Sequence, residues 1–342
     1  MPDTTAESLL QALTHALHAR SALIAQLHAE QTNAYRLFHG SVEGVAGLCV
    51  DRYGELLLVQ SFHRPLPAAL LDTLRAFYAQ ALPGLQLVYN DRSQAHSRIR
   101  NTLDAAEQIA AAQSHEISEG GVKYLIQARH GGQDPWLFLD LRAARRRVMQ
   151  EAAGKRLLNL FAYTCGVGVA AACAGAAQVL NIDFAEASLA VGKQNAQLNR
   201  PPIGVRFLKS DAFAAMRQLS GIGQPQIVRG KRLPPFPKLD KQSFDLVFLD
   251  PPRYAKSPFG VVDLINDYPA VFKPALLCTA EGGSLICNNN VADVRRDAWL
   301  AQLERSALKA GRPIREIEWI QPDSDFPCRD EHVPLKTVLL RV

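Results

Sequence analysis

The stretch that most constrains the fold begins at residue 157 and reads LLNLFAYTCGVGVAAACAGAAQVLNID. An apolar run enters a loop of small residues, an alanine-rich segment follows, and a second apolar run ends in Asp183. Strand, glycine loop, helix, strand and acid in this order outline a nucleotide-binding βαβ unit. Gly166, Gly168 and Ala171 also fit the G-x-G-x-x-A pattern of dinucleotide sites, so this stretch alone leaves the cofactor open.

After residue 150 the order of strand and helix patterns is that of an α/β fold. Helical patterns separate most of the apolar strand candidates, and IREIEWI and KTVLLRV close the chain as two strands that can pair as an antiparallel edge. We therefore predict the Rossmann-like, seven-stranded sheet of a class I methyltransferase. A dinucleotide dehydrogenase would not need the closing hairpin. The parallel strands are expected at 156–161, 178–182, 204–208, 244–249 and 283–287.

The first part of the chain follows other patterns. Apolar residues between 7 and 30 share one helical face, which predicts a single amphipathic helix. From residue 35 the apolar period changes to two, with a hairpin turn at DRYGE, a helix near 66–81 and a hairpin tip at Gly120-Gly121. We expect an N-terminal helix at 1–32, a small α+β domain at 33–130, for which RNA binding is one option, and the methyltransferase domain at 131–342.

Charge and cysteine content narrow the class of protein. The formal net charge of +5 permits a nucleic-acid partner without requiring one. Six cysteines are scattered without a C-x-x-C pair, which predicts reduced thiols in the cytoplasm and no metal site. The start MPDTTAESLL does not resemble a signal peptide, and no apolar stretch approaches the ~20 residues that cross a bilayer. The sequence leaves the oligomeric state open, a dimer included.

Three acids follow three successive strands. Asp183, Asp211 and Asp250 come at the carboxyl ends of the second, third and fourth expected strands, where ligands bind in open α/β sheets. They suit a ribose, an adenine amino group and a cationic centre, which S-adenosylmethionine combines. The pyrophosphate of NAD(P) would be a poor neighbour for Asp250. For Asp183 alone, a helix N-cap is the plainer reading.

The fourth strand runs into the string DPPR. Pro251 and Pro252 stop the strand and fix a stiff, extended turn. Asp-Pro-Pro in this register is similar to the edge of nucleic-acid methyltransferases that holds a target base against the methyl donor.

From about residue 30 to the end, the chain resembles the large-subunit ribosomal RNA methyltransferases, both the cytosine-C5 enzymes and, more closely, a guanine-N7 module. The strings that carry the resemblance are NAYRLFHGSVEGVAGLCVDRYGELLLVQ, LFLDLRAARRRV, LNLFAYTCGVGVAA, GGSLICNNN and SDFPCRDEH. The resemblance implies an enzyme that uses S-adenosylmethionine on RNA, and a set of cofactor-binding residues. That expected set is Phe138, Arg142, Asn159, Phe161, Tyr163, Thr164, Cys165, Gly166, Gly168, Asp183, Phe184, Asp211, Ala212 and Asp250.

Two departures from the family pattern bear on the target atom. The nucleophilic cysteine of the cytosine-C5 enzymes falls at Asn289, and Cys287 lies two residues earlier on the expected strand. Guanine N7 carries its own lone pair and needs no covalent intermediate, so we favour it. The expected catalytic residues are Asp250, Pro251, Pro252, Tyr254, Asn288 and Asn289, with a plain turn as the alternative for the three asparagines.

Basic residues predict contacts with RNA phosphate. Four arginines crowd the string RAARRR, although a solvated helix face explains them as well. The proline-rich, basic loop at 221–242 would extend the same surface, or is a neutral insertion. The expected RNA-binding residues are Arg145, Arg146, Arg229, Lys231, Arg232 and Arg253.

Three other functions remain open at this point. One is cytosine-C5 methylation with Cys287 as nucleophile, another is an NAD(P)-dependent oxidoreductase, and the third is an RNA-binding protein without turnover. Cys165 is expected beside the methionine part of the cofactor and not as a nucleophile, in a loop that needs fewer positive φ angles than a pyrophosphate turn.

Overall fold

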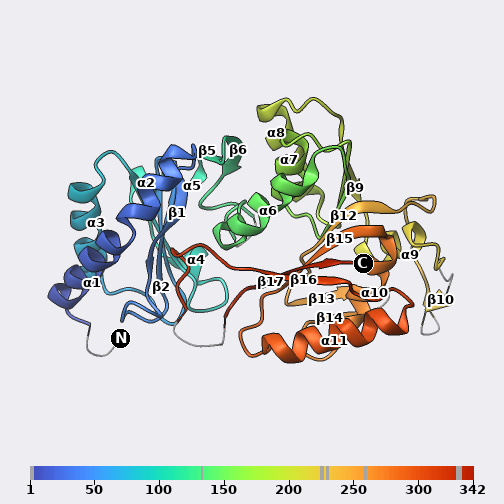
Figure 1. Ribbon diagram of the computed structural model, residues 1–342. Coiled ribbons are helices and arrows are strands. Elements are labelled where there is room, and N and C mark those ends of the chain that lie inside the picture. Colours follow the sequence, from blue (N-terminus) through green and yellow to red (C-terminus); the bar gives the residue numbers. More distant parts are fainter. Residues whose placement is uncertain (1–3, 132–133, 224–226, 229–230, 258–259, 329–332) are drawn as a thin grey trace. The chain divides into compact units, whose positions relative to one another are not determined.

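The computed structural model describes residues 4–131, 134–223, 227–228, 231–257, 260–328 and 333–342 (Figure 1). The chain forms two compact units, Met1–Arg142 with Asp323–Arg329, and Ala143–Pro322 with Asp330–Val342. The expected boundary near residue 130 differs from this division, because the segment before α6 joins the first unit and a short C-terminal segment joins it too.

The first unit is built around a four-stranded sheet of order β1-β2-β3-β4. β1, β2 and β3 pair antiparallel, whereas β4 pairs parallel to β3 because α3 carries the chain back. β5 and β6 form the predicted hairpin, with positive φ at Gly120 and Gly121. Its elements are α1 (Ala6–Ala19), α2 (Ser21–Ala29), β1 (Ala34–His39), β2 (Leu48–Tyr53), β3 (Leu56–Ser61), α3 (Ala68–Ala81), β4 (Gln86–Asp91), α4 (Ser97–Arg100), α5 (Ala105–Ala112), β5 (His115–Glu119), β6 (Val122–Ile126) and the 3-10 helix η1 (Leu139–Leu141).

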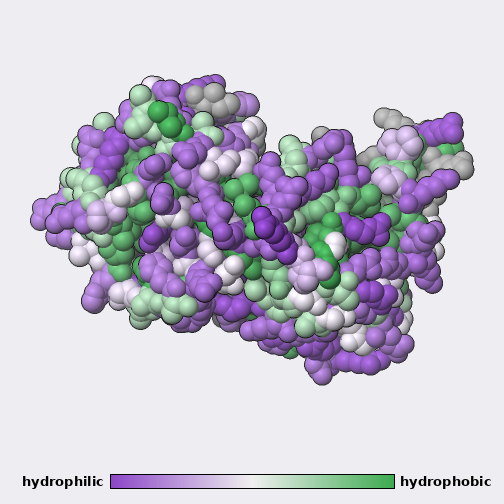
Figure 2. All heavy atoms as spheres, turned by 90° about the horizontal axis from the view of Figure 1, so that it is seen from above, coloured by the Kyte–Doolittle hydropathy of each residue, from purple (hydrophilic) through white to green (hydrophobic). Residues whose placement is uncertain are grey.

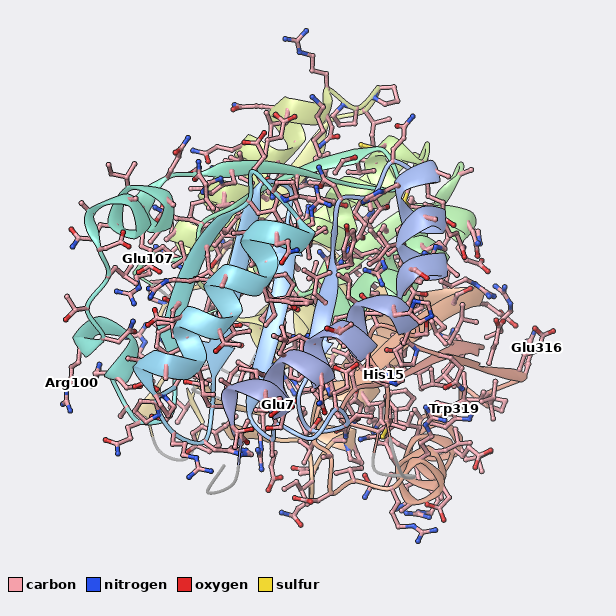
Figure 3. All side chains as sticks on the ribbon, turned by 90° about the vertical axis from the view of Figure 1, so that its left-hand side faces the viewer. Glu7, His15, Arg100, Glu107, Glu316 and Trp319 are labelled. Atoms are coloured by element: carbon pink, nitrogen blue, oxygen red, sulfur yellow. The ribbon has the colours of Figure 1, made fainter. Side chains whose placement is uncertain are left out.

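The prediction of a single N-terminal helix is wrong. α1 ends at Ala19, and Arg20 is at once its C-cap and the N-cap of α2. Leu9 and Leu13 of α1 are fully buried in the same core as Leu74 of α3, so this helix is part of the first unit's core. Figure 3 shows α1 and α3 across one face of the sheet, with His15 on α1.

The second unit contains the seven-stranded sheet. Its elements are α6 (Arg142–Ala152), β7 (Arg156–Leu160), α7 (Gly166–Cys173), β8 (Gln178–Asp183), α8 (Glu186–Asn199), β9 (Val205–Lys209), α9 (Ala212–Leu219), β10 (Ile227–Val228), β11 (Lys231–Arg232), β12 (Phe244–Leu249), β13 (Tyr254–Ser257), β14 (Gly260–Asp263), α10 (Pro269–Cys278), β15 (Thr279–Asn289), α11 (Arg296–Lys309), β16 (Glu316–Ile320) and β17 (Lys336–Arg341).

The order of this sheet is β16-β17-β15-β12-β7-β8-β9. β15, β12, β7, β8 and β9 run parallel, and β17 and β16 close the sheet as the predicted antiparallel edge. α7 and α8 cover one face, while α9, α10 and α11 cover the other (Figure 1). The predicted architecture, a Rossmann-like seven-stranded sheet with a small α+β domain before it in the chain, is confirmed.

Two findings concern what the described part of the chain does not contain. No described helix is both long enough and apolar enough to pass through a membrane. Among the same residues, no group of three or more His, Cys, Asp or Glu side chains is placed to hold a metal ion.

Hydrophilic residues cover most of the face seen in Figure 2. The large hydrophobic side chains that are exposed lie on different elements, and Phe184 and Tyr254 are among them.

Candidate functional site

The carboxyl ends of the parallel strands form one edge of the second unit's sheet. The chain runs from β7 outward to β8 and β9, then returns to β12 on the other side of β7. The strand order therefore reverses between β7 and β12, which is where open α/β sheets bind ligands. Asp183 is the last residue of β8, Asp211 follows β9 and Asp250 follows β12, so the three acids lie along this edge as predicted.

The loop between β7 and α7 has an unusual backbone. Phe161, Tyr163 and Cys165 have φ angles of 56°, 49° and 60°, although none of them is a glycine. Residues with side chains rarely adopt such angles, and they cluster at functional sites when they do. Three positive φ angles among five residues do not fit the expectation that this loop needs fewer of them than a pyrophosphate turn. The glycine that follows, Gly166, is the first residue of α7.

Cys165 directs its side chain into the protein. It is fully buried, and burial together with the Asp183 charge raises the pKa of its thiol well above the ordinary value. A Cβ added to Gly192 of α8 would lie 2.6 Å from the Cys165 sulfur. Cys165 thus packs against α8, and its protonated thiol is a poor nucleophile, in keeping with the expectation that it is not one.

Gly168 allows α7 to pack closely on the sheet. A Cβ at Gly168 would lie 2.0 Å from Oδ1 of Asn181 on β8, so any other residue would collide there. The same Oδ1 accepts a hydrogen bond of 2.8 Å from Nδ2 of Asn159, and Nδ2 of Asn181 donates to the Arg206 carbonyl oxygen. Asn159 therefore joins β7 to β8 beneath the helix.

Asp183 organises the loop from the strand side. Its Oδ2 accepts from the Tyr163 amide and its Oδ1 from the Ala185 amide, both at 2.8 Å. Burial raises the pKa of this carboxyl even though these amides act to lower it. Phe184, the next residue, is 68% exposed at the same edge. The carboxylate and the aromatic ring thus belong to consecutive residues, and their cofactor-binding roles stay predictions.

Asp211 and Ala212 begin the helix that follows β9. Asp211 is the N-cap of α9, and its Oδ1 accepts from the Ala214 amide at 3.1 Å. Ala212 is buried at the first position of that helix. The cap explains this acid locally, so its adenine-binding role stays a prediction.

The turn after β12 places polar and aromatic groups at the surface. Pro251 is buried and Pro252 half-buried, whereas Arg253 and Tyr254 are exposed. Tyr254 is 61% exposed and begins the β13–β14 hairpin. The turn that contains Asp250 is thus followed directly by the exposed guanidinium group of Arg253 and the exposed ring of Tyr254.

Asn288 and Asn289 do not have the open side chains that base recognition would need. Both are fully buried at the end of β15. Oδ1 of Asn289 accepts from the Val291 amide and its Nδ2 donates to the Leu264 carbonyl oxygen. The amide of Asn289 is therefore used within the fold, as in the plain turn that was the alternative for these asparagines.

In contrast to Asn289, Asn288 has one side-chain atom without a hydrogen-bond partner among the described residues. Its Oδ1 accepts from the Thr337 hydroxyl at 2.7 Å, and its backbone oxygen accepts from the Tyr268 hydroxyl at 2.8 Å. Its buried Nδ2 has no hydrogen-bond partner among the described residues. A role for this one donor in base binding stays a prediction.

Cys287 belongs to the hydrophobic core of the sheet. It is fully buried beside Leu249 of β12, its register partner. Burial raises the pKa of its thiol well above the ordinary value. A nucleophilic cysteine needs an accessible thiolate, so this environment disfavours the cytosine-C5 alternative.

Two predicted cofactor residues, Phe138 and Arg142, belong to the first unit. Phe138 is 38% exposed. Arg142 is buried and donates to Asp323 at 2.6 Å and to Asp325 at 2.5 Å, so its guanidinium group is paired with two carboxylates of the chain. The expected contact of Arg142 with a cofactor carboxylate would have to replace these pairs.

The predicted RNA-binding residues lie in different environments. Arg145 is buried, which corrects the expectation of an exposed phosphate contact there, and Arg146 is half-buried. Arg232 and Arg253 are exposed. The backbone of Lys231 lies in β11, and Arg229 lies outside the described residues.

Several residues that shape the site were not predicted. Asn181, Gly192 and Asn195 all contact the segment 161–168. Asn181 is a polar residue inside an apolar strand, which is a signal that the sequence did offer. Gly192 and Asn195 lie three apart on one helix face, but only the fold shows what that face meets.

The comparisons with known proteins agree with this geometry. A family model described as S-adenosylmethionine-dependent methyltransferase matches residues 35–341. The ribosomal RNA large subunit methyltransferase I of Escherichia coli is 25% identical over 86% of this chain and 70% of its own length. The protein of that name from Aeromonas salmonicida is 27% identical, over 93% of this chain and 75% of its own length. A crystal structure of a methyltransferase complexed with SAH has a TM-score of 0.78 at 22% identity, covering 99% of this chain and 82% of that one.

Proposed function

Because this chain belongs to the S-adenosylmethionine-dependent methyltransferase family, we propose that it methylates a nucleobase of large-subunit ribosomal RNA, with guanine N7 as the favoured atom. The family supplies the methyl donor and the class of reaction, which overturns the NAD(P)-dependent oxidoreductase alternative. The RNA substrate and the target atom are the proposal.

The turn after β12 carries the proposal. Asp250 and two prolines end the strand, and the exposed Arg253 and Tyr254 follow at once. An exposed aromatic ring stacks on an unpaired base, and an adjacent guanidinium group pairs with phosphate. The curated relatives named above, at 25% and 27% identity, are ribosomal RNA methyltransferases by name, which supports RNA as the substrate.

The residues of the sheet edge fit S-adenosylmethionine. The oxygens of Asp183 accept from backbone amides and have further lone pairs for ribose hydroxyls. Phe184 offers a ring to the adenine, and the loop 161–166, Asp211 and Asp250 are further members of the expected set. When bound, the cofactor supplies a methyl group on a sulfonium centre, a strong electrophile.

The environment of Cys287 favours guanine N7 over cytosine C5. Cytosine C5 requires a thiolate that attacks the ring, whereas Cys287 is buried in the core with its pKa raised. Guanine N7 has an in-plane lone pair and needs only alignment with the methyl group. The role of the chain is then to orient the base, with Asp250, the carbonyl groups of Pro251 and Pro252, and Tyr254.

Phosphate contacts complete the proposal. Among the predicted RNA-binding residues whose side chains are described, Arg232 and Arg253 are exposed and Arg146 is half-buried. Lys231 and Arg229 belong to the same basic segment and stay predicted contacts. Such RNA would be met in the cytoplasm, the compartment that the free cysteines also favour.

The test is a comparison of modified nucleosides in ribosomal RNA from cells with and without this protein. We expect 7-methylguanosine at one position of large-subunit RNA to disappear with the protein and to return when it is restored. Loss of 5-methylcytidine instead would support the cytosine-C5 alternative. An unchanged ribosomal RNA profile would contradict the proposed substrate.

A further inference from the structure

The strained loop after β7 requires something that holds it. Phe161, Tyr163 and Cys165 keep left-handed angles that cost free energy for any residue with a side chain. Such conformations persist only where the surrounding structure over-determines them. Backbone hydrogen bonds from Ala162 to the Ile182 oxygen and from Cys165 to the Ala162 oxygen hold the loop, and so does the bond from the Tyr163 amide to Asp183.

Gly192 of α8 provides the space that Cys165 fills. A Cβ on Gly192 would lie 2.6 Å from the Cys165 sulfur, 2.9 Å from its Cβ and 3.2 Å from the Thr164 carbonyl oxygen. Contacts below 3.0 Å to a buried side chain cannot be relieved cheaply in a close-packed interior. The position therefore requires glycine for as long as Cys165 keeps its place.

Asn195 grips the loop from the same helix face. It lies three residues after Gly192, and residues with this spacing face the same neighbour. Its Nδ2 donates to the Thr164 carbonyl oxygen at 3.1 Å, and its side chain is 1% exposed. Gly192 and Asn195 thus contact two consecutive residues of the loop, Thr164 and Cys165.

We propose that α8 is the template of the cofactor loop, the segment 161–166 between β7 and α7: the helix holds this loop in the conformation that binds S-adenosylmethionine. Gly192 and Asn195 are then positioning residues for cofactor binding. The inference rests on membership of the methyltransferase family and is independent of the RNA substrate proposed above. A loop that is already held in its binding conformation loses less conformational freedom when the cofactor binds. Removing the template should therefore weaken cofactor affinity much more than it slows turnover at saturating cofactor.

The first experiment adds a methyl group on α8 and then removes the loop side chain that this methyl group would meet. Gly192→Ala should raise the Kd of S-adenosylmethionine on the order of tenfold or more, because the methyl group displaces Cys165. Cys165→Gly removes two of the three close contacts, so the double variant should recover most of that affinity. A double variant that binds as poorly as Gly192→Ala, or a Gly192→Ala variant that binds normally, would overturn the proposal.

The second experiment keeps the proposal falsifiable should Gly192→Ala fail to fold. Asn195→Ala should raise the Kd on the order of tenfold while kcat at saturating cofactor stays within about twofold. Asn199→Ala, an asparagine one turn further along α8, should leave the Kd unchanged. Val191→Ala removes a buried side chain of the same helix and should lower the Tm without a matching change in Kd.

Those two control variants decide between positioning and mere stability. If Asn195→Ala raises the Kd no more than Val191→Ala does at an equal loss of Tm, α8 only stabilises the fold and the proposal is wrong. A fall in kcat with an unchanged Kd would equally overturn it.

Discussion

Cys165 shows how a residue of the wrong type can occupy a left-handed position. Its φ of 60° would suit glycine, and its sulfur instead fills the space left by Gly192. Packing of a buried side chain can offset the strain of such an angle. The cysteine is thus a packing residue of the cofactor loop.

At the same scale, Asp183 should control cofactor affinity. In Asp183→Asn the side-chain NH2 group must face one of the two amides, of Tyr163 or Ala185, that the carboxylate now accepts from. We expect the Kd of S-adenosylmethionine, measured by calorimetry, to rise at least about tenfold. Glu186→Gln changes an exposed acid nearby and serves as the control. A Kd within threefold of wild type would refute this role.

Cys287 should be dispensable for methyl transfer. Cys287→Ala and Cys278→Ala each remove a thiol from the same buried core, and each should cost about 1–2 kcal/mol of unfolding free energy. We expect kcat/KM with RNA to stay within about threefold for both variants. A loss beyond a hundredfold in Cys287→Ala alone, at equal stability, would show a nucleophile.

At the scale of the element, Glu151 holds α6 to β17 through Arg341. Burial would raise the pKa of this carboxyl, but hydrogen bonds from Arg341 and Lys155 outweigh burial and lower the pKa to about 2. A carboxyl with a lowered folded-state pKa stabilises the fold above its unfolded pKa, and this stability is lost as the pH falls toward 2. The ordinary value is 4.5, so the loss should fall between about pH 5 and 2.

The matching measurement is urea unfolding of wild type and Glu151→Gln at pH 7 and pH 3. The variant should be less stable at pH 7 by on the order of 1 kcal/mol, and the difference should shrink at pH 3. An equal difference at both pH values would show that the hydrogen bonds do not depend on the charge of Glu151.

Most elements of the second unit could be predicted because apolar strands and glycine turns are local signals. The break at Arg20 could not, since apolar residues continue along both helices and hide the change of direction. The left-handed angles of the 161–165 loop could not be predicted either, for a related reason. Contacts that hold this loop come from β8 and α8, up to about thirty residues along the chain, and no local pattern of Phe161, Tyr163 or Cys165 indicates them.

At the scale of the whole molecule, the chain returns to the first unit at Asp323–Arg329. Asp325 is 1% exposed and accepts from Arg142 and from the Arg36 amide. Asp325→Ala leaves a buried guanidinium group with one carboxylate fewer, so we expect unfolding free energy to fall by about 3 kcal/mol. Asp323→Ala, at a more exposed partner of Arg142, should cost clearly less in the same urea titration. Equal losses would contradict this account of the segment.

The return of this segment could not be predicted, because it depends on pairs between residues about 180 positions apart. The three acids of the sheet edge could, because parallel topology alone brings strand ends together. Predicted contacts failed where a polar side chain serves the fold instead, as at Asn289 and Arg145. Sequence patterns locate polar residues but do not show which of their atoms are already bonded.

The most direct test of the central claim is transfer of a labelled methyl group from S-adenosylmethionine to large-subunit ribosomal RNA by the purified protein. We predict stoichiometric label in one nucleoside, 7-methylguanosine, and loss of that label in Asp250→Ala. A protein that binds S-adenosylmethionine but places no label in this RNA, while labelling transfer RNA or a small molecule, would contradict the account.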